Sequence, residues 1–428
     1  MNPIIAEAQF YTSVVWITVV ILGIVLFWDI LYIARRKKGH HTAKKFFPKA
    51  SLIIPAFNEG KVLGKTLQKI LDSRYPRNNL EVIVVDDGST DDTEKVAKKF
   101  GVRLIKNAAN LGKCESLNVG IKNASNEIII TTDADTEFEK DTIENLVKHF
   151  SDEGVGAVAG YYKALPFKNV LTNFSLNKLK TFFLVKFQSL EYLLFLFARR
   201  RQAAFDAVMV VPGSIGAFRK NVLQEIGGFD SGMLIEDYDA TVKIHKAGYK
   251  VVCEKNALAW TKAPTSFYEL FKQRFRWYKG GFEVLSKHSG MITSRHGFVG
   301  IILGFEYITI FLQLIMLSFV GAVLYEQAVL LHQNILQLLW NWVHGFIHFR
   351  PIDVFGGIII SMFAVGLAEA YVSVKMSRDS LKNLFFYLIS MPYLSVLGFI
   401  WLYSLVAHVT KRKTELRGRG WKTSIKIV

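Results

Sequence analysis

The sequence predicts an α/β fold with a mainly parallel sheet, set between apolar segments long enough to cross a membrane. Between residues 50 and 160, short runs rich in valine and isoleucine alternate with helical stretches. This spacing is typical of βαβ units, in which connected strands run parallel. Ala8–Trp28 carries no charge over 21 residues, and uncharged runs return after residue 295. The soluble fold is therefore expected between membrane segments.

Five apolar runs are predicted to be strands: Ser51–Pro55, Leu80–Val85, Val102–Ile105, Glu127–Thr132 and Val155–Ala159. The stretches between them are predicted to be helices: 60–72, 90–100, 114–122 and 140–150. Ligands of such sheets bind at the carboxyl ends of the strands. The residues that directly follow each strand are therefore the first candidates for chemistry.

Composition and charge exclude several classes of protein. Hydrophobic residues make up 51% of the 428, which excludes a disordered chain. Two cysteines, Cys114 and Cys253, are too few for a disulfide framework or a four-thiolate zinc site. The net charge of +17 is concentrated: residues 35–49 carry seven Lys/Arg and no acid, and 411–428 carry seven against one glutamate. Basic stretches beside apolar spans follow the positive-inside rule, so nucleic acid is not expected as a partner.

The apolar segments predict a multi-pass protein of the cell membrane. A helix of 21 residues at 1.5 Å per residue crosses a hydrocarbon layer of ~30 Å, and we expect an N-terminal anchor over 8–34. Residues 297–410 are expected to hold the C-terminal spans, and 411–428 a basic cytosolic tail. The mixed stretch 170–200 and the helix 267–285 are predicted to lie at the membrane surface or, for the former, to be buried.

Two acidic clusters follow predicted strands. Helix capping explains Ser89, Thr90 and Asp91 in the first cluster, but it leaves Asp86 and Asp87 free to hold a nucleoside. The second cluster contains Asp133 and Asp135. Two carboxylates this close suit a divalent cation that also binds a diphosphate, although a solvated loop would look the same.

Two further clusters lie downstream. Glu236-Asp237-Tyr238-Asp239 is either a charged surface or the site of a general base, which accepts a proton from an attacking hydroxyl. Gln273-Arg274-Phe275-Arg276-Trp277 lies in a predicted helix. Its arginines can neutralise a diphosphate and its tryptophan can stack on a sugar. The alternative is a basic and aromatic helix that lies on a membrane.

Taken in order, these motifs resemble the processive membrane glycosyltransferases of family 2, which include cellulose, hyaluronan, chitin-oligosaccharide and poly-N-acetylglucosamine synthases. The resemblance covers residues 48–290 and the membrane segments around them. The motifs that carry it are Pro55-Ala56-Phe57-Asn58-Glu59, Asp86-Asp87-Gly88-Ser89, Asn110-Leu111-Gly112-Lys113 with Leu117-Asn118, Asp133-Ala134-Asp135, Glu236-Asp237 and Gln273 through Trp277.

The resemblance implies a cytosolic domain of the GT-A type, an inverting transfer from a UDP-sugar and a Mg²⁺ or Mn²⁺ ion. The residues it assigns to the nucleotide sugar are Ala56, Glu59, Asp86, Asp87, Lys113, Asp133, Gln273 and Arg276. Asp133 and Asp135 are implied to bind the metal, and Asp237 to be the catalytic base. Trp277 and Glu236 are implied to contact the acceptor.

Three functions remain open at this point. The favoured one extends a β-linked polysaccharide from a donor of the UDP-GlcNAc or UDP-Glc type and moves the product across the membrane. The second transfers a single sugar to a membrane lipid, as ceramide glucosyltransferases with a similar Arg-Trp motif do. The third is a non-catalytic transporter or scaffold with a degenerate domain. It predicts a missing motif, whereas all the motifs are present.

Overall fold

The computed structural model describes residues 46–166, 175–292, 297–308 and 383–411, with single residues and short backbone stretches elsewhere. The chain divides into two compact units. One contains Lys38–Gly300 and Ala370–Val428, and its fold is described below. The predicted anchor over 8–34 lies outside the described residues apart from Tyr32, as does most of the predicted membrane region before residue 383.

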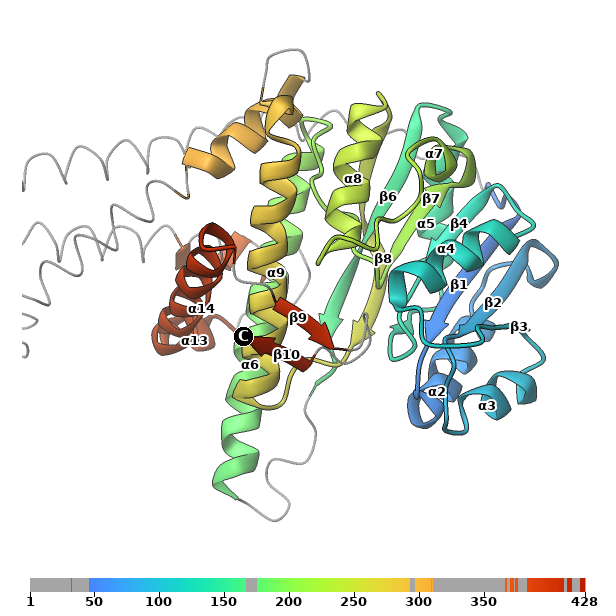
Figure 1. The fold of residues 1–428 in the computed structure, drawn as a ribbon, viewed down its shortest axis with the longest axis horizontal. Helices are drawn as coiled ribbons and strands as arrows, with labels where there is room; N and C mark the ends of the chain where they lie inside the picture. The colour runs from blue at the N-terminus through green and yellow to red at the C-terminus, as the bar shows by residue number, and fades with distance from the viewer. Residues whose placement is uncertain are drawn as a thin grey trace, which may run out of the picture. The chain divides into compact units, whose positions relative to one another are not determined.

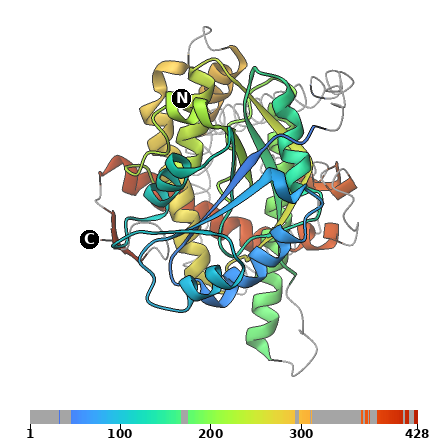
Figure 2. The ribbon, with the colours of Figure 1, turned by 90° about the vertical axis from the view of Figure 1, so that its right-hand side faces the viewer.

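The described residues form one eight-stranded sheet in the order β3-β2-β1-β4-β7-β6-β8-β5, together with a two-stranded sheet near the C-terminus (Figures 1 and 2). The eight strands are β1 (Ala50–Ala56), β2 (Leu80–Asp86), β3 (Arg103–Lys106), β4 (Ile128–Thr131), β5 (Glu137–Phe138), β6 (Val155–Ala164), β7 (Gly216–Arg219) and β8 (Lys250–Thr261). The two-stranded sheet pairs β9 (Thr414–Arg417) with β10 (Ser424–Ile427).

The prediction of a mainly parallel sheet is confirmed, and β6 and β8 also pair parallel, but two strands, β7 and β5, run in the opposite direction. Strands β3, β2, β1 and β4 run parallel, as expected. Strand β7 then enters between β4 and β6 and is antiparallel to both, and β5 is antiparallel to β8. The five predicted strands are present, but β5, β7 and β8 were not predicted. β5 and β7 are very short, and the centre of β8 carries Glu254 and Lys255, so these strands lack the apolar run that identified the others.

Helices cover both faces of the sheet because successive strand residues point to opposite sides. In β1, Leu52 and Ile54 pack against α2 (Gly60–Leu71), α3 (Thr93–Lys99) and α5 (Thr142–Val147). Ile53 faces the other side, where α4 (Lys113–Asn123), α7 (Lys220–Glu225) and α8 (Glu236–Lys246) lie. Short 3₁₀ turns occur at Arg77–Asn79, Lys148–Ser151 and Ser289–Met291. The fold is a three-layer sandwich, which confirms the α/β class.

Two long helices stand at the β6–β8 side of this sandwich. The stretch predicted over 170–200 forms α6 (Leu176–Ala203), and the helix predicted over 267–285 is α9 (Phe267–Lys287). Each begins with a serine cap: Ser175 accepts from the N–H of Lys178, and Ser266 from that of Glu269.

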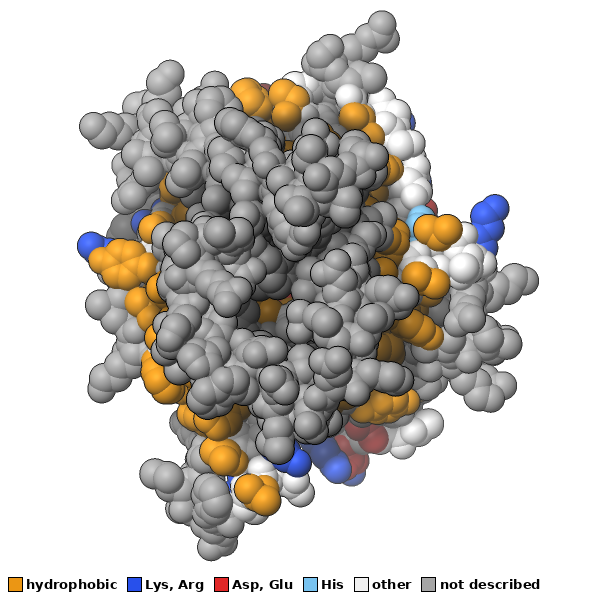
Figure 3. Space-filling view, turned by 90° about the vertical axis from the view of Figure 1, so that its left-hand side faces the viewer, with side chains coloured by type: hydrophobic (Ala, Val, Ile, Leu, Met, Phe, Trp, Pro, Cys, Tyr) orange, Lys and Arg blue, Asp and Glu red, His pale blue; other side chains and the backbone are white. Residues whose placement is uncertain are grey.

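Near the C-terminus, α13 (Asn383–Leu388) and α14 (Met391–Val409) join these helices (Figure 1). Leu270 and Phe275 of α9 share an apolar cluster with Tyr393, Leu397 and Ile400 of α14. Among the described residues, the segments Leu176–Ala203 and Pro392–Val409 are long and apolar enough to cross a membrane, judged by length and composition. Hydrophobic side chains gather on the side of the molecule where α13 and α14 lie (Figure 3), and exposed ones include Phe385, Phe399 and Val409.

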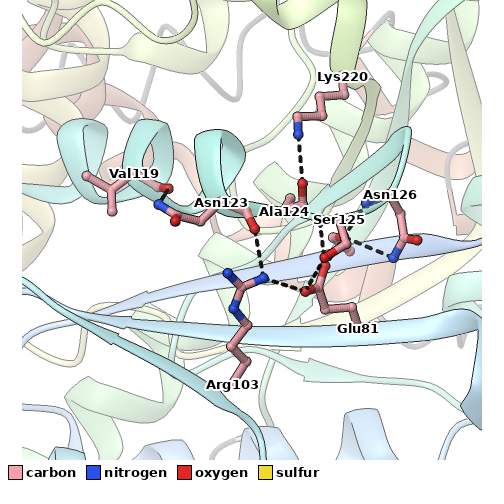
Figure 4. A network of polar contacts seen from close by, with 9 residues as sticks. Glu81, Arg103, Val119, Asn123, Ala124, Ser125, Asn126 and Lys220 are labelled. Carbon is pink, nitrogen blue, oxygen red and sulfur yellow. Dashed lines mark hydrogen bonds and ion pairs between the residues drawn. The ribbon is translucent and has the colours of Figure 1, made fainter.

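A polar network lies at the end of the sheet where β1 and β2 begin (Figure 4). Glu81 accepts hydrogen bonds from the hydroxyls of Ser51 and Ser125 and forms an ion pair with Arg103 at 2.7 Å. Lys220 donates to the backbone carbonyl of Ala124 beside it. The polar groups at this end of the strands are therefore paired with one another. The candidate site residues lie at the opposite end, where the strands finish.

Candidate active site

The predicted site residues meet at the carboxyl ends of the parallel strands. The strand register places Ala56 beside Asp86, so the loops after β1 and β2 leave the sheet together. Thr131, the last residue of β4, pairs with Gly216, the first residue of the antiparallel β7. The loop before β7 therefore reaches the same edge. The reversed strand brings this loop into the site, which a fully parallel sheet would not do.

Side chains of the loop after β2 hold the loop after β1. The N–H of Asn58 donates to the Ser89 hydroxyl, and the N–H of Glu59 to the Thr93 hydroxyl, both at 2.9 Å. Asp91 accepts from the N–H of Gly60, the first residue of α2. Asp91 also accepts from the N–H of Thr93, the first residue of α3, which confirms the capping role inferred for it. It therefore accepts from the first residues of two helices, α2 and α3. These contacts fix the position of Glu59, and the N–H of Asp87 donates to the carbonyl of Ala56.

The two aspartates at the end of β2 have different surroundings. Asp87 is buried and accepts from the side chain of Asn107 and from the N–H groups of Leu111 and Gly112, at 2.7–2.9 Å. It therefore shapes the loop that leads to Lys113. Asp86 accepts from the N–H of Ser89 through one oxygen. Its other oxygen is buried and has no hydrogen-bond partner among the described residues. Asp86 is thus the better placed of the two to accept a hydrogen bond from a ligand.

Lys113 is the cation at the centre of the site. Its Nζ lies 2.5 Å from Asp133 Oδ1 and 3.8 Å from Glu236 Oε1, so it joins the loop after β4 to the start of α8. Burial alone would lower the pKa of Lys113, but the Asp133 and Glu236 carboxylates outweigh this and raise it. Lys113 therefore stays charged at neutral pH and can offset negative charge in the site.

Asp237 lies next to this cluster. Its Oδ2 accepts from the backbone N–H of Gly213 at 3.0 Å, and its Oδ1 from the N–H of Tyr238 at 2.9 Å. Burial and the neighbouring Glu236 raise the pKa of Asp237, against the opposing effects of the Gly213 N–H, Lys113 and Arg276. A raised pKa increases the affinity of a carboxylate for a proton, which suits a general base.

Asp133 and Asp135 fit a divalent cation. Burial, together with the charges of Asp133 and Glu59, raises the pKa of Asp135 to about 6. This repulsion between carboxylates would be relieved by a hard cation. Within the described residues, no group of three or more His, Cys, Asp or Glu side chains is arranged to hold a metal ion. A cation here would complete its coordination with water and phosphate oxygens, as Mg²⁺ commonly does.

The last predicted residues lie on helix α9, and the contacts of Arg276 place it beside the site, whereas those of Trp277 and Gln273 are to α6 and to Arg274. Arg276 donates to the carbonyl of Leu234 at 3.2 Å, just before Glu236 and Asp237. Trp277 is half-buried, with its ring 6.2 Å from that of Phe195 on α6. The side-chain oxygen of Gln273 accepts from Arg274. The structure thus joins α9 to the start of α8.

Comparison with known proteins identifies the domain. Residues 51–227 match the model for glycosyl transferase family 2. This chain contains a family 2 glycosyltransferase domain. It is 31% identical over 241 residues to the poly-beta-1,6-N-acetyl-D-glucosamine synthase of Staphylococcus epidermidis, over 55% of each chain. It is 30% identical over 253 residues to the probable glycosyltransferase YdaM of Bacillus subtilis, over 57% of each. The chain thus aligns with little more than half the length of these curated relatives.

A solved structure has the same fold. The mannosyltransferase PcManGT of Pyrobaculum calidifontis, in complex with GDP-Man and Mn²⁺, superposes with a TM-score of 0.54. The match covers 93% of this chain and all of the other, at 19% identity. At this identity the likeness concerns the fold alone. Together with the family match it supports a GT-A-like, mixed-sheet α/β fold for the family 2 domain.

Sequence reasoning missed two residues of the family 2 domain, one at the site and one that contacts α9. A Cβ atom on Gly213 would lie 3.4 Å from Lys113 Nζ and 3.8 Å from carboxylate oxygens of both Asp237 and Glu236. The Pro212-Gly213-Ser214 turn before β7 was the available signal. The other is Glu191, which sequence reasoning treated only as a charge that interrupts an apolar stretch. It lies beneath α9, paired with Arg274.

We expect the side chain of Asn118 to stabilise the contact between α4 and the backbone of Phe229. This side chain both donates to the carbonyl of Phe229 and accepts from the Phe229 N–H, at 2.8 and 3.0 Å. Asn118→Ala leaves these backbone groups without their partner and should lower the free energy of unfolding by about 1–3 kcal/mol. Thermal unfolding measures the loss. Asn123→Ala, an exposed asparagine on the same helix, is the matched control. Equal melting temperatures for the two variants would contradict this prediction.

Proposed function

We propose that the protein is a membrane-bound, UDP-sugar-dependent β-glycosyltransferase that extends a polysaccharide from a donor of the UDP-GlcNAc or UDP-Glc type. One observation carries the proposal. Lys113 lies 2.5 Å from Asp133 and 3.8 Å from Glu236, so the motif residues of three separate segments converge beside Asp237. The family match and the similarity to poly-N-acetylglucosamine synthases support the donor and the polysaccharide acceptor.

In the proposed reaction, Asp237 accepts the proton of an acceptor hydroxyl. The hydroxyl oxygen forms a bond to the anomeric carbon of the donor while the bond from that carbon to the diphosphate breaks. A single displacement inverts the configuration, so an α-linked donor gives a β-linked product. The raised pKa of Asp237, due to burial and to Glu236, favours the proton transfer.

Two cations offset the charge of the departing diphosphate in this proposal. Lys113 is held by Asp133 and Glu236, and Arg276 by the carbonyl of Leu234, so both are positioned before the substrate arrives. Preorganised charge of this kind is a large contribution to catalysis. A Mg²⁺ or Mn²⁺ ion at Asp133 and Asp135, when bound, would neutralise the diphosphate further. The buried free oxygen of Asp86 is assigned to the nucleoside.

Translocation of the product is the membrane part of the proposal. Helix α9, which carries Arg276 and Trp277, packs on α14, one of the two helices long and apolar enough to cross a membrane. An acceptor bound at Trp277 would therefore lie beside candidate membrane helices. We propose that the catalytic domain faces the cytosol and that the product leaves through the membrane.

The deciding experiment measures UDP release and product length together. Purified full-length protein is incubated with UDP-GlcNAc, UDP-Glc or GDP-Man, each with Mg²⁺ or Mn²⁺, and the products are sized by mass spectrometry. UDP release with a β-linked oligosaccharide series would support the proposal. A product of one sugar on a lipid would replace the polysaccharide acceptor by a membrane lipid. Absence of transfer from every donor would overturn the enzymatic assignment.

A further inference from the structure

The guanidinium of Arg274 is buried and makes three side-chain hydrogen bonds, yet the proposed reaction does not use it. It lies on α9, within the motif that ends at Trp277, and its side chain has no exposed surface. Its Nε and Nη2 donate to the two carboxylate oxygens of Glu191 on α6, at 2.9 and 2.6 Å. This is a bidentate pair, the geometry that fixes an arginine most precisely.

The same guanidinium contacts both of its functional neighbours on α9. Its Nη1 donates to the side-chain oxygen of Gln273, so the amide of Gln273 has a defined orientation. Its centre lies 4.2 Å from the centroid of the Trp277 ring, which is a close cation–π contact. Arg274 therefore fixes the amide of one site residue and one face of the indole of another.

A third helix joins the pair. The hydroxyl of Tyr393 on α14 donates to Glu191 Oε2 at 2.5 Å. Glu191 thus accepts from two helices, α9 and α14, while belonging to α6. Burying an ion pair costs desolvation free energy, and a well-packed apolar contact in its place often stabilises a core equally well or better. What the pair adds over such a contact is a defined geometry for the groups around it.

We infer that the pair formed by Glu191 and Arg274, linked to α14 by Tyr393, is a positioning device that orients Trp277 for the acceptor. The inference rests on the proposed function for its consequence, because Trp277 is proposed to contact the acceptor sugar. Arg274 and Glu191 are positioning residues and touch no substrate. The arrangement also makes the acceptor site depend on α14, a candidate membrane helix, so the position of that helix affects transfer.

The first test measures the position of Trp277 without any need for activity. Hydroxyl-radical footprinting of the purified full-length protein reports the oxidation rate of Trp277 by peptide mass spectrometry. Glu191→Gln weakens the bidentate pair and should raise this rate severalfold, and Tyr393→Phe should raise it less. The matched control is Glu254→Gln, which weakens another buried carboxylate cluster, with Lys148 and His149, on β8. An unchanged rate in Glu191→Gln, or an equal rise in Glu254→Gln, would overturn the inference.

The second test measures the consequence for transfer. We expect Glu191→Gln to raise the KM for the acceptor about tenfold, since misplaced binding groups lose the benefit of orientation. The KM for the donor should rise less, because Gln273, assigned to the nucleotide sugar, is one of several groups that bind it. Glu254→Gln should change neither. If Glu191→Gln does not fold, Tyr393→Phe, which removes a single hydroxyl, takes its place. An equal rise in both KM values would contradict the acceptor assignment. A wild-type protein without activity would contradict the proposed function, while footprinting would still decide the positioning role.

Discussion

Asp237→Asn should lower the rate of sugar transfer by about 10²–10⁴-fold, the usual contribution of a general base. The asparagine keeps the size of the side chain, and its one oxygen can keep one of the two hydrogen bonds from the N–H groups of Gly213 and Tyr238, which reach different carboxylate oxygens of Asp237. It cannot take a proton from the acceptor. Donor binding should survive, because Lys113, Asp133 and Asp86 are unchanged. Initial rates of UDP release and the affinity for UDP, measured by calorimetry, separate these two effects.

The pH dependence of turnover is a second test of Asp237 as the general base. Burial and Glu236 raise the pKa of Asp237, so the carboxyl takes up a proton at a higher pH than an ordinary aspartic acid does. Only the ionised form can act as a base, and turnover should therefore fall as the pH drops through this raised pKa. The Asp237→Asn variant should lose this acidic limb. Asp152→Asn, an exposed aspartate paired with Lys250, is the control and should behave as wild type. Loss of UDP binding in step with turnover would make Asp237 a binding residue instead.

The fold was predictable where the sequence pattern is local. Strands β1, β2 and β4 are buried on both faces and appear in the sequence as continuous apolar runs. Such runs do not indicate whether a strand pairs parallel or antiparallel with its neighbour. β7 has four residues and lies antiparallel between β4 and β6. It follows β6 in the chain only after the long helix α6. The mixed sheet could therefore not be derived from residue pattern alone.

The convergence of several motif segments was predictable from the sequence, whereas the roles of their residues stay predictions. The motifs identified Lys113, Asp133 and Asp237, and the structure brings their segments together. The motif residue Asp87, however, bonds to the chain itself, because the loop before α4 needs an acceptor for its N–H groups. Backbone groups such as the Gly213 N–H carry no side-chain signal at all. Long-range partners such as Glu191, 83 positions from Arg274, are visible only once the helices pack.

Asp135→Asn should lower turnover by at least about a hundredfold. A bound cation supplies several kcal/mol of stabilisation to a developing charge, and each 1.36 kcal/mol corresponds to a tenfold change in rate. Asp135 is held close to Asp133 and Glu59, whose charges, after burial, raise its pKa to about 6. This excess of negative charge is what a divalent cation would offset. Removing one carboxylate lowers the attraction for the cation and leaves the ion pair between Lys113 and Asp133 in place.

Binding of Mn²⁺ provides a measurement that does not depend on turnover. Electron paramagnetic resonance counts free Mn²⁺ in the presence of the protein and UDP, and Asp135→Asn should bind it at least tenfold more weakly than wild type, in line with the loss of one of two carboxylate ligands. Asp141→Asn, an exposed aspartate paired with Arg74, is the matched control and should bind normally. Excess Mn²⁺ should restore part of the turnover of Asp135→Asn if the ion is weakly bound rather than absent. Two results would exclude Asp133 and Asp135 as the metal site: wild-type activity that persists in excess chelator, or normal Mn²⁺ affinity in Asp135→Asn. Lys113 and Arg276 would then be the charges that neutralise the diphosphate.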